Sequence, residues 1–333
     1  NSLNQSLNRI AGRMNYIRST NNNSSNQNIR LAMNFDNPLV TEMLNSLSAK
    51  LINKQKKTEK WGVWSEGNIS FGRIGQQDGN LGQDIHSDGI TFGIDKRINE
   101  DKTIGFAVNK SWQETEVGSN EANMDAAAIS IMNYTSFKIE EKRYLEIVAG
   151  IGEMDIDLSR VVTGGKNTGN RKGNQIFGSF TYLLEPDVEI VGRNLNYYTR
   201  LDLGFTQLKA YTEIGDGTAV SYKKQNVKSL SLSAGFNLSK IIETDKAILE
   251  PSLKFELGKD KTINSVSEAY YVNNASEIYS NSIGDQSSGH LLFNLGIGAK
   301  FKNELSINSS YEHYRSEDDA FNNNFSIYVR KPL

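Results

Sequence analysis

The 333-residue chain has no cysteine, only four prolines and no long apolar run. Without cysteine, the chain can form neither a disulfide framework nor a thiolate metal site. A mean hydropathy of −0.51, with no stretch near ~18 apolar residues, excludes a helical membrane protein. The formal net charge of −2 offers no basic footprint for nucleic acid. The low mean hydropathy does not exclude a membrane β-barrel, because its strands alternate lipid-facing and water-facing residues and their average hydropathy is therefore low.

The small net charge hides a division of the chain at Trp61. Residues 1–60 carry nine Lys or Arg and three Asp or Glu, a net of +6, whereas the remainder carries 28 against 36, a net of −8. The run from 19 to 28 is polar throughout, and such a segment buries too little surface to offset its ordering entropy. We therefore interpret residues 1–36 as a linker and the chain as the C-terminal piece of a longer precursor.

Residues 37–60 are expected to form an amphipathic helix and its link to the next segment. Asn37 suits an N-cap and Pro38 suits the first helical position. About 19 residues at ~1.5 Å each span roughly 28 Å, close to the hydrocarbon thickness of a bilayer. Taken alone, such a helix would most simply cover a soluble core. Its apolar stripe and the lysines near its end are Leu39, Met43, Leu44, Leu47, Lys50, Leu51 and Lys54.

From Trp61 onward the hydrophobic period changes from 3.6 to 2, which is typical of β-strands with one apolar face. The strands are too long for a sandwich of roughly five-residue strands. We expect twelve of them, at about 61–74, 87–98, 102–116, 124–138, 142–157, 174–184, 195–213, 225–241, 246–260, 289–302, 303–315 and 322–333.

Short charged junctions alternate with longer junctions rich in Gly, Asn and Ser. The short ones lie near 99–102, 139–142, 243–246 and 302–304. The longer ones include 75–86, 163–174 and 260–289. Tight turns at one end and long loops at the other are typical of outer-membrane barrels. An even strand count also places both ends of the barrel segment on the side of the short turns. The sequence thus predicts an all-β membrane protein, a 12-stranded antiparallel transmembrane β-barrel over 61–333.

At these positions the sequence resembles the autotransporter β-domain, the translocator barrel of type V secretion. Residues 61–67 (WGVWSEG), after a pore-length helix, are similar to the first strand of that family. Residues 93–97 and the strand that begins at Ile104 are similar to its paired hydrophobic strands. The final strand is similar to its assembly signal, although Leu333 stands where the family usually has Phe. The residues of that signal are Phe325, Ile327, Val329 and Leu333.

The resemblance implies that the helix threads the pore and that an upstream passenger domain is exported to the surface of a Gram-negative bacterium. The implied partners are outer-membrane lipid, the covalently linked passenger, the barrel-insertion machinery and periplasmic chaperones, and the barrel is expected to be monomeric. An acidic lumen would suit the basic end of the helix. The expected lumen residues are Glu66, Asp95, Glu146, Arg200, Asp202, Glu250, Lys254 and Glu256.

Other functions have weaker support in the sequence. His86 lies between Asp84 and Asp88, and His290 follows Asp285, but we interpret both histidines as solvated polar residues rather than catalytic or metal-binding groups. We do not expect self-cleavage at an asparagine of the helix segment, and we expect neither an enzyme nor a cofactor. A free-standing channel for small solutes is the main alternative, and a soluble β-rich binding module is a more distant one.

Overall fold

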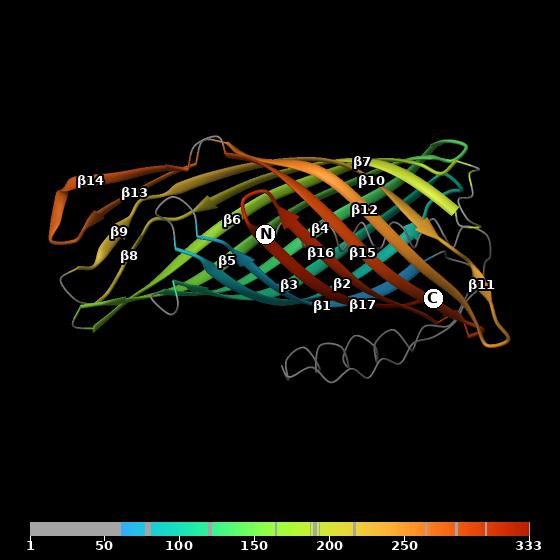
Figure 1. Cartoon of the computed structure of the whole chain (residues 1–333), viewed down its shortest axis with the longest axis horizontal. Helices are drawn as coiled ribbons and strands as arrows, with labels where there is room; N and C mark the ends of the chain where they lie inside the picture. Colours follow the sequence, from blue (N-terminus) through green and yellow to red (C-terminus); the bar gives the residue numbers. More distant parts are fainter. Residues whose placement is uncertain are drawn as a thin grey trace.

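The computed structural model describes residues 61–332 apart from 77–80, 119–121, 164, 187, 189–191, 193, 216–217, 264, 284–285 and 304, and it is all-β there (Figure 1). In this part of the chain, no helix has the length and hydropathy to cross a bilayer. The predicted helix and linker lie outside the described residues. The strands are β1 (Trp61–Ile74), β2 (Gln83–Arg97), β3 (Lys102–Val117), β4 (Ala122–Glu140), β5 (Arg143–Val162), β6 (Gly165–Leu184), β7 (Asn194–Leu208), β8 (Tyr211–Thr212), β9 (Val220–Tyr222), β10 (Gln225–Ser239), β11 (Ile242–Glu243), β12 (Ala247–Ile263), β13 (Ser265–Tyr271), β14 (Asn274–Ile283), β15 (Gln286–Phe301), β16 (Ser306–Ser316) and β17 (Ala320–Pro332).

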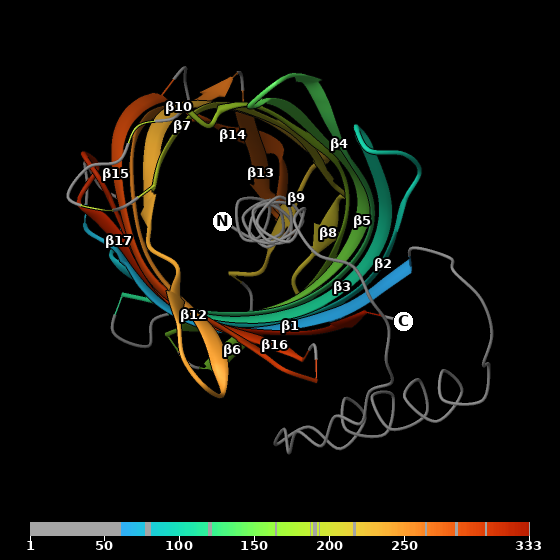
Figure 2. The same cartoon turned by 90° about the vertical axis from the view of Figure 1, so that its right-hand side faces the viewer.

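Twelve of these strands close into one antiparallel barrel. Each pairs with its neighbours in chain order, and β1 pairs with β17. β10 pairs directly with β12, although the two-residue strand β11 lies between them in the chain. The β1–β17 seam runs from Gly62 opposite Pro332 to Ile74 opposite Ala320. Viewed along its long axis, the sheet forms a continuous ring (Figure 2). The predicted strand number and closed architecture are therefore confirmed.

Side chains alternate across the barrel wall because successive strand residues point to opposite faces of a sheet. The outer face carries large apolar residues, among them Phe106 and Ile151, whose exposed fractions are 58% and 61%. The inner face carries mostly small polar groups, such as Thr91, Asn109 and Ser233, which are buried. A soluble protein would bury the first set and expose the second. The wall is thus built with its apolar side outward.

We call the end of the barrel where β1 begins and β17 ends the turn end, and the opposite end the loop end. The turn end includes the links 98–101, 141–142 and 302–305. Trp61 begins β1 and Pro332 ends β17 at this same end. One of the long junctions predicted at the loop end is wrong. The predicted loop 163–174 is instead a tight turn, with β5 and β6 paired as far as Val162 and Gly165.

The predicted long junction at 260–289 is present, and it contains the hairpin β13–β14. It joins β8 and β9 from the β7–β10 connection in a second, four-stranded sheet of order β14-β13-β9-β8. This loop-end sheet extends beyond the barrel in Figure 1. The predicted strand 195–213 accordingly ends at Leu208, because Tyr211 and Thr212 pair with β9 instead. The strands in these segments carry mostly polar residues, so the sequence shows no apolar alternation there.

Candidate functional site

The barrel interior holds the predicted lumen residues. Each of these residues lies on the inner face of its strand, so its side chain contacts other side chains of the barrel interior. Glu250 and Lys254, both on β12, are half-buried. The fully buried members of the set are Glu66, Asp95, Glu146, Arg200, Asp202 and Glu256.

A cluster of large side chains packs inside the barrel around Trp64. The Trp64 indole lies 5.9 Å from Tyr328 and meets Tyr134 edge to face at 6.1 Å. Its Nε1–H donates to the Tyr134 hydroxyl at 2.6 Å, and that hydroxyl donates to Asp95 Oδ2 at 2.9 Å. A Cβ added at Gly93 would overlap the indole ring. The relay satisfies two buried polar groups and fixes how far each ring reaches across the interior. The whole cluster comprises Trp64, Ala107, Met132, Tyr134, Val148, Phe177 and Tyr328.

A charged network lies on the opposite wall, centred on Glu256 of β12. Arg200 of β7 donates from its terminal nitrogen to Glu256 Oε1 at 2.9 Å, and its Nε lies 3.1 Å from Asp202 Oδ2. The Arg200–Glu256 bond skips the intervening strand β10, whose interior residue Ser233 is small. Ser179 of β6 donates to Asp202 at 2.5 Å. Two barrel strands besides β12, namely β6 and β7, are thus tied into the network by charge-assisted hydrogen bonds.

Glu256 is fully buried and has further partners. Tyr198 donates its hydroxyl proton to Glu256 Oε2 at 2.5 Å, and Lys254 Nζ lies 3.5 Å from the same oxygen. His290 of β15 places Nε2 at 3.5 Å from Oε1. A buried carboxylate is costly unless it is paired and hydrogen-bonded. Glu256 meets that requirement through side chains from β7, β12 and β15.

His290 shows where the sequence interpretation was wrong. Its side chain is only 4% exposed, and its Nδ1 lies 2.8 Å from Asp260 Oδ2. Tyr314 donates to the same oxygen at 2.8 Å. His290 is therefore an interior residue rather than a solvated one. The sequence signal that was available is its register, since His290 falls on the polar phase of the Leu291–Leu295 alternation.

The network is built to hold charge and does not resemble a catalytic centre. A general base needs a free ring nitrogen within reach of a proton, yet both nitrogens of His290 face carboxylates. Among the described residues, no group of three His, Cys, Asp or Glu is placed to hold a metal ion. His86 is exposed on the outer wall and its ring contacts Phe71 at 5.0 Å. The interior chemistry that remains is ion pairing and hydrogen bonding.

Two other predicted sets lie at the edges of the described structure. Phe325 and Ile327 of β17 are exposed on the outer face, whereas Val329 is only 4% exposed. Val329 pairs with Ser65, which is also buried. Leu333 and the helix residues Leu39, Met43, Leu44, Leu47, Lys50, Leu51 and Lys54 lie outside the described residues.

The loop-end sheet is fastened to the barrel by two arginines that sequence reasoning missed. Arg160 of β5 forms two hydrogen bonds with the Glu213 carboxylate, at 2.7 and 3.3 Å, and Glu213 Oε2 also accepts the Val220 N–H at 3.0 Å. Arg171 of β6 donates to the carbonyls of Lys209 and Lys223 at 2.9 and 3.0 Å. Each arginine therefore joins a barrel strand to the β8–β9 segment.

An aromatic stack lies beside these arginines. Tyr211 and Tyr222 are parallel, with ring centroids 4.9 Å apart, and the Arg171 guanidinium lies 5.4 Å from the Tyr211 centroid. Burial raises the pKa of both phenols, so they stay neutral beside the cation. Stacking of this kind holds a guanidinium plane in place. The loop-end sheet thus has a specific, ordered attachment to the barrel.

A closed antiparallel ring with an apolar outer wall, a polar interior and tight turns at one end is the architecture of an outer-membrane β-barrel. Residues 63–312 match the family model described as the autotransporter β-domain. The chain belongs to this family, whose members are translocator domains of outer-membrane proteins in Gram-negative bacteria. No curated protein sequence matches the chain.

Solved autotransporter domains share the fold. The translocator domain of autotransporter NalP from Neisseria meningitidis has 17% identity and a TM-score of 0.66, covering 89% of this chain and 95% of that one. The β-domain of the Bordetella autotransporter BrkA has 13% identity and a TM-score of 0.61, with 82% and 100% coverage. The transport unit of AIDA-I from Escherichia coli has 12% identity and a TM-score of 0.50, with 89% and 97% coverage. At these identities the likeness concerns the fold alone.

Proposed function

We propose that this barrel is embedded in the outer membrane of a Gram-negative bacterium, where it anchors and exports a passenger domain joined upstream of residue 1. Family membership supports the translocator role, and the outward apolar wall supports contact with outer-membrane lipid. The observation that carries the proposal is the polar, charged interior of a closed twelve-stranded ring. A barrel of this size is wider than one filled by its own side chains, so a polypeptide can occupy its axis.

The segment 37–60 occupies that axis as a helix. Its Lys50 and Lys54 match the interior carboxylates, which include Glu66, Asp95 and Glu146. The cluster around Trp64 offers apolar surface on which the Leu and Met residues of the helix can pack. Opposite charges attract strongly where water is scarce. The helix therefore closes the pore after export, and residues 1–36 connect it to the passenger.

Single-channel conductance of the full chain in planar bilayers tests the closed pore. The wild-type barrel should show small, infrequent openings. Lys50→Gln with Lys54→Gln should increase the open fraction, because the helix loses part of its attraction to the interior while the barrel wall is untouched. Lys102→Gln with Lys302→Gln, at the turn end, is the matched control and should not change the open fraction. A large, steadily open wild-type pore would instead support the alternative of a free-standing solute channel.

Export itself is tested with a reporter domain fused before Asn1. Protease added to intact cells should remove the reporter when the barrel is folded, and it should leave the reporter untouched when β17 is deleted. A reporter that stays inside cells with a folded wild-type barrel would contradict the export role. Insertion machinery and periplasmic chaperones act before this stage, and the barrel works as a monomer without cleaving its own helix.

A further inference from the structure

The outermost strand of the loop-end sheet, β14, is exposed on both of its faces. Every side chain from Tyr271 to Asn281 is exposed, including the apolar side chain of Ile278 (49%) and the ring of Tyr279 (48%). A β-sheet normally buries at least one face against other structure. The neighbouring strand β13 follows this rule, because its side chains are half-buried from Ser267 to Tyr270. β14 therefore lacks the cover that its neighbour has.

One edge of β14 has no pairing partner among the described residues. The sheet has the order β14-β13-β9-β8, which places β14 at its end. The pairing with β13 is regular from Ser265 opposite Ile283 to Ala269 opposite Tyr279, and the register shifts only beyond that point. Native edge strands often carry Lys or Pro, which prevent the addition of another strand. β14 has neither, so its outer edge can accept an extended segment by β-augmentation.

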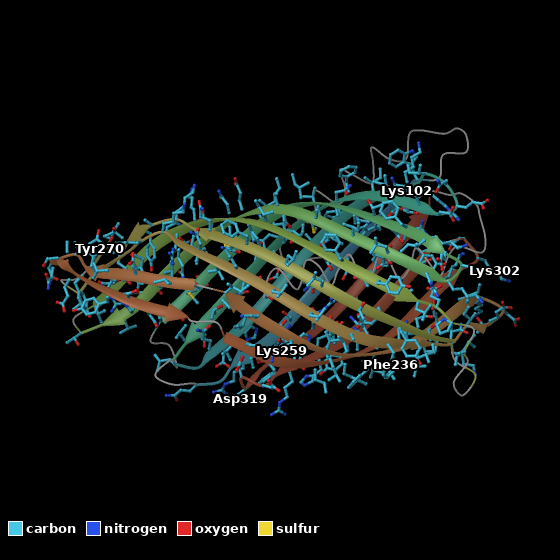
Figure 3. All side chains as sticks on the ribbon, turned by 90° about the horizontal axis from the view of Figure 1, so that it is seen from above. Lys102, Phe236, Lys259, Tyr270, Lys302 and Asp319 are labelled. Carbon is cyan, nitrogen blue, oxygen red and sulfur yellow. The ribbon has the colours of Figure 1, made fainter. Side chains whose placement is uncertain are left out.

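This edge extends outward from the loop-end mouth of the barrel. In Figure 3, Tyr270 of β13 lies well beyond Asp319, which belongs to the turn between β16 and β17. Viewed along the barrel axis, β9 and β13 are drawn within the outline of the ring (Figure 2). From Asn274, β14 runs back to Ile283, and the chain re-enters the barrel wall at Gln286. A polypeptide that leaves the pore at the loop end therefore passes close to this sheet.

The linker contains a short segment with the sequence pattern of a β-strand. Apolar side chains occupy every second position over 29–35, namely Ile29, Leu31, Met33 and Phe35. The polar run 19–28 precedes the segment, and Asn37, the expected N-cap of the helix, follows it closely. Alternation over four to eight residues between such boundaries predicts a strand with one apolar face.

The position of segment 29–35 follows from the proposed function, on which this inference rests. With the helix 37–60 in the lumen and Trp61 at the turn end, Asn37 lies at the loop end. Segment 29–35 is then the first part of the chain outside the pore. Seven extended residues span roughly 23 Å, which matches the seven residues Glu277–Ile283. Both segments run towards the barrel, so they can pair in parallel.

We propose that residues 29–35 add a fifth strand to the loop-end sheet, parallel to β14 and alongside Glu277–Ile283. In this register Leu31 lies beside Tyr279, whose ring meets Tyr271 edge to face at 5.7 Å. The apolar face of the segment thus extends an aromatic surface that is now exposed. No like charge opposes the pairing, because Arg30 is the only charge of the segment and residues 265–283 contain no Lys or Arg. The start of the exported chain is thereby held beside the pore.

Disulfide trapping tests the pairing directly, because the chain has no cysteine of its own. Met33→Cys is combined with Asn281→Cys in the full chain that carries the reporter domain before Asn1. After mild oxidation, mass spectrometry should find the disulfide-linked peptides about fivefold more often than for Ser24→Cys with Asn281→Cys. Met33→Cys with Ser276→Cys, which is out of register, should be linked as rarely as that control. Equal yields in the three variants would overturn the proposal.

Hydrogen exchange provides a second test that needs no cysteine. Leu31→Asp with Met33→Asp should accelerate amide exchange in residues 277–283 by about tenfold, because the outward N–H groups of β14 lose their partners. Ser24→Asp with Ser25→Asp adds the same charge within the polar run and should leave this exchange unchanged. Similar exchange in the wild type and the first variant would overturn the fifth strand.

Export is measured in the same cells by adding protease to remove the reporter. Export without preferential linkage of Met33→Cys to Asn281→Cys would overturn the fifth strand and leave the translocator role intact. Absence of export from a folded wild-type barrel would instead contradict the proposed function, and this inference with it. The two failures are therefore distinguishable.

Discussion

Arg160 of β5 and Glu213, between β8 and β9, are joined by two hydrogen bonds that connect the barrel wall to the loop-end sheet. The Glu213 side chain is almost fully buried, whereas that of Arg160 is about one third exposed. The carboxylate also accepts the Val220 N–H. This one residue therefore ties a barrel strand and the turn of a hairpin together.

Replacing Glu213 by Ala should loosen the loop-end sheet and leave the barrel folded. Hydrogen bonds to charged groups contribute about 1.5–3 kcal/mol, and the sheet is short. Amide hydrogen exchange should therefore accelerate in residues 211–222 of the variant. Lys223→Ala is the control, because it removes an exposed ion pair with Glu268 worth about 0–1 kcal/mol. Equal acceleration in the two variants would show that the Arg160 contact is not the anchor.

Glu256→Gln should destabilise the barrel strongly. The substitution keeps the shape of the side chain but removes the charge that Arg200 and Lys254 share, so that Arg200 retains only Asp202, and breaking a buried pair costs about 3–5 kcal/mol. The urea midpoint, followed by tryptophan fluorescence in detergent, should fall. Glu250→Gln on the same strand is the matched control, because Glu250 is only half-buried, and it should shift the midpoint much less. Similar midpoints for both variants would contradict the central role of Glu256.

Phe106→Arg and Ile94→Arg should each impair barrel insertion. Both side chains lie on the outer face, where an arginine at the bilayer midplane costs about 2–4 kcal/mol. Heat-modifiable migration on gels should reveal a smaller folded fraction. Glu114→Arg, on the same outer face but beyond the apolar belt, should fold normally. Normal folding of all three variants would mean that the lipid-facing side has been assigned to the wrong face.

Gly93→Ala should weaken the cluster around Trp64, because the new methyl group overlaps the indole. Overpacking of this kind costs about 1–3 kcal/mol. The double variant Gly93→Ala with Trp64→Ala should be less destabilised than the sum of the single variants, since the overlap is gone. A double-mutant cycle of unfolding free energies measures this coupling. Strict additivity would indicate that Gly93 is required for another reason.

The barrel could be predicted because its information is local. Alternation in segments such as Leu291–Phe301 reveals which face is apolar, and a closed ring then follows from strand number and turn lengths. The polar phase of the alternation in β7 and β12 predicts that Arg200, Asp202 and Glu256 face the lumen, and all three side chains are buried. The alternation predicts the face of the sheet on which each side chain lies. It does not predict which interior side chains pair with one another.

The contacts that sequence missed depend on register between distant strands. His290 meets Asp260 because Gly289 lies opposite Lys259 in the β12–β15 ladder, and no local pattern encodes that offset. The loop-end sheet escaped for a related reason. Strand β14 carries mostly polar residues on both faces, as barrel strand β6 does from Lys166 to Asn170, so the sequence resembles a loop. Long-range pairing, rather than propensity, orders those segments.

The seam between β1 and β17 has a consequence for the order of events in assembly. Trp64 pairs with Arg330, so the contact that closes the ring joins residues separated by almost the whole length of the barrel segment. The ring cannot close before β17 has paired with β1, and until then both edges of the sheet expose unpaired backbone groups. Such edges invite aggregation, and pairings between distant residues form slowly. A protein of this design spends its most vulnerable period as a nearly complete, open sheet.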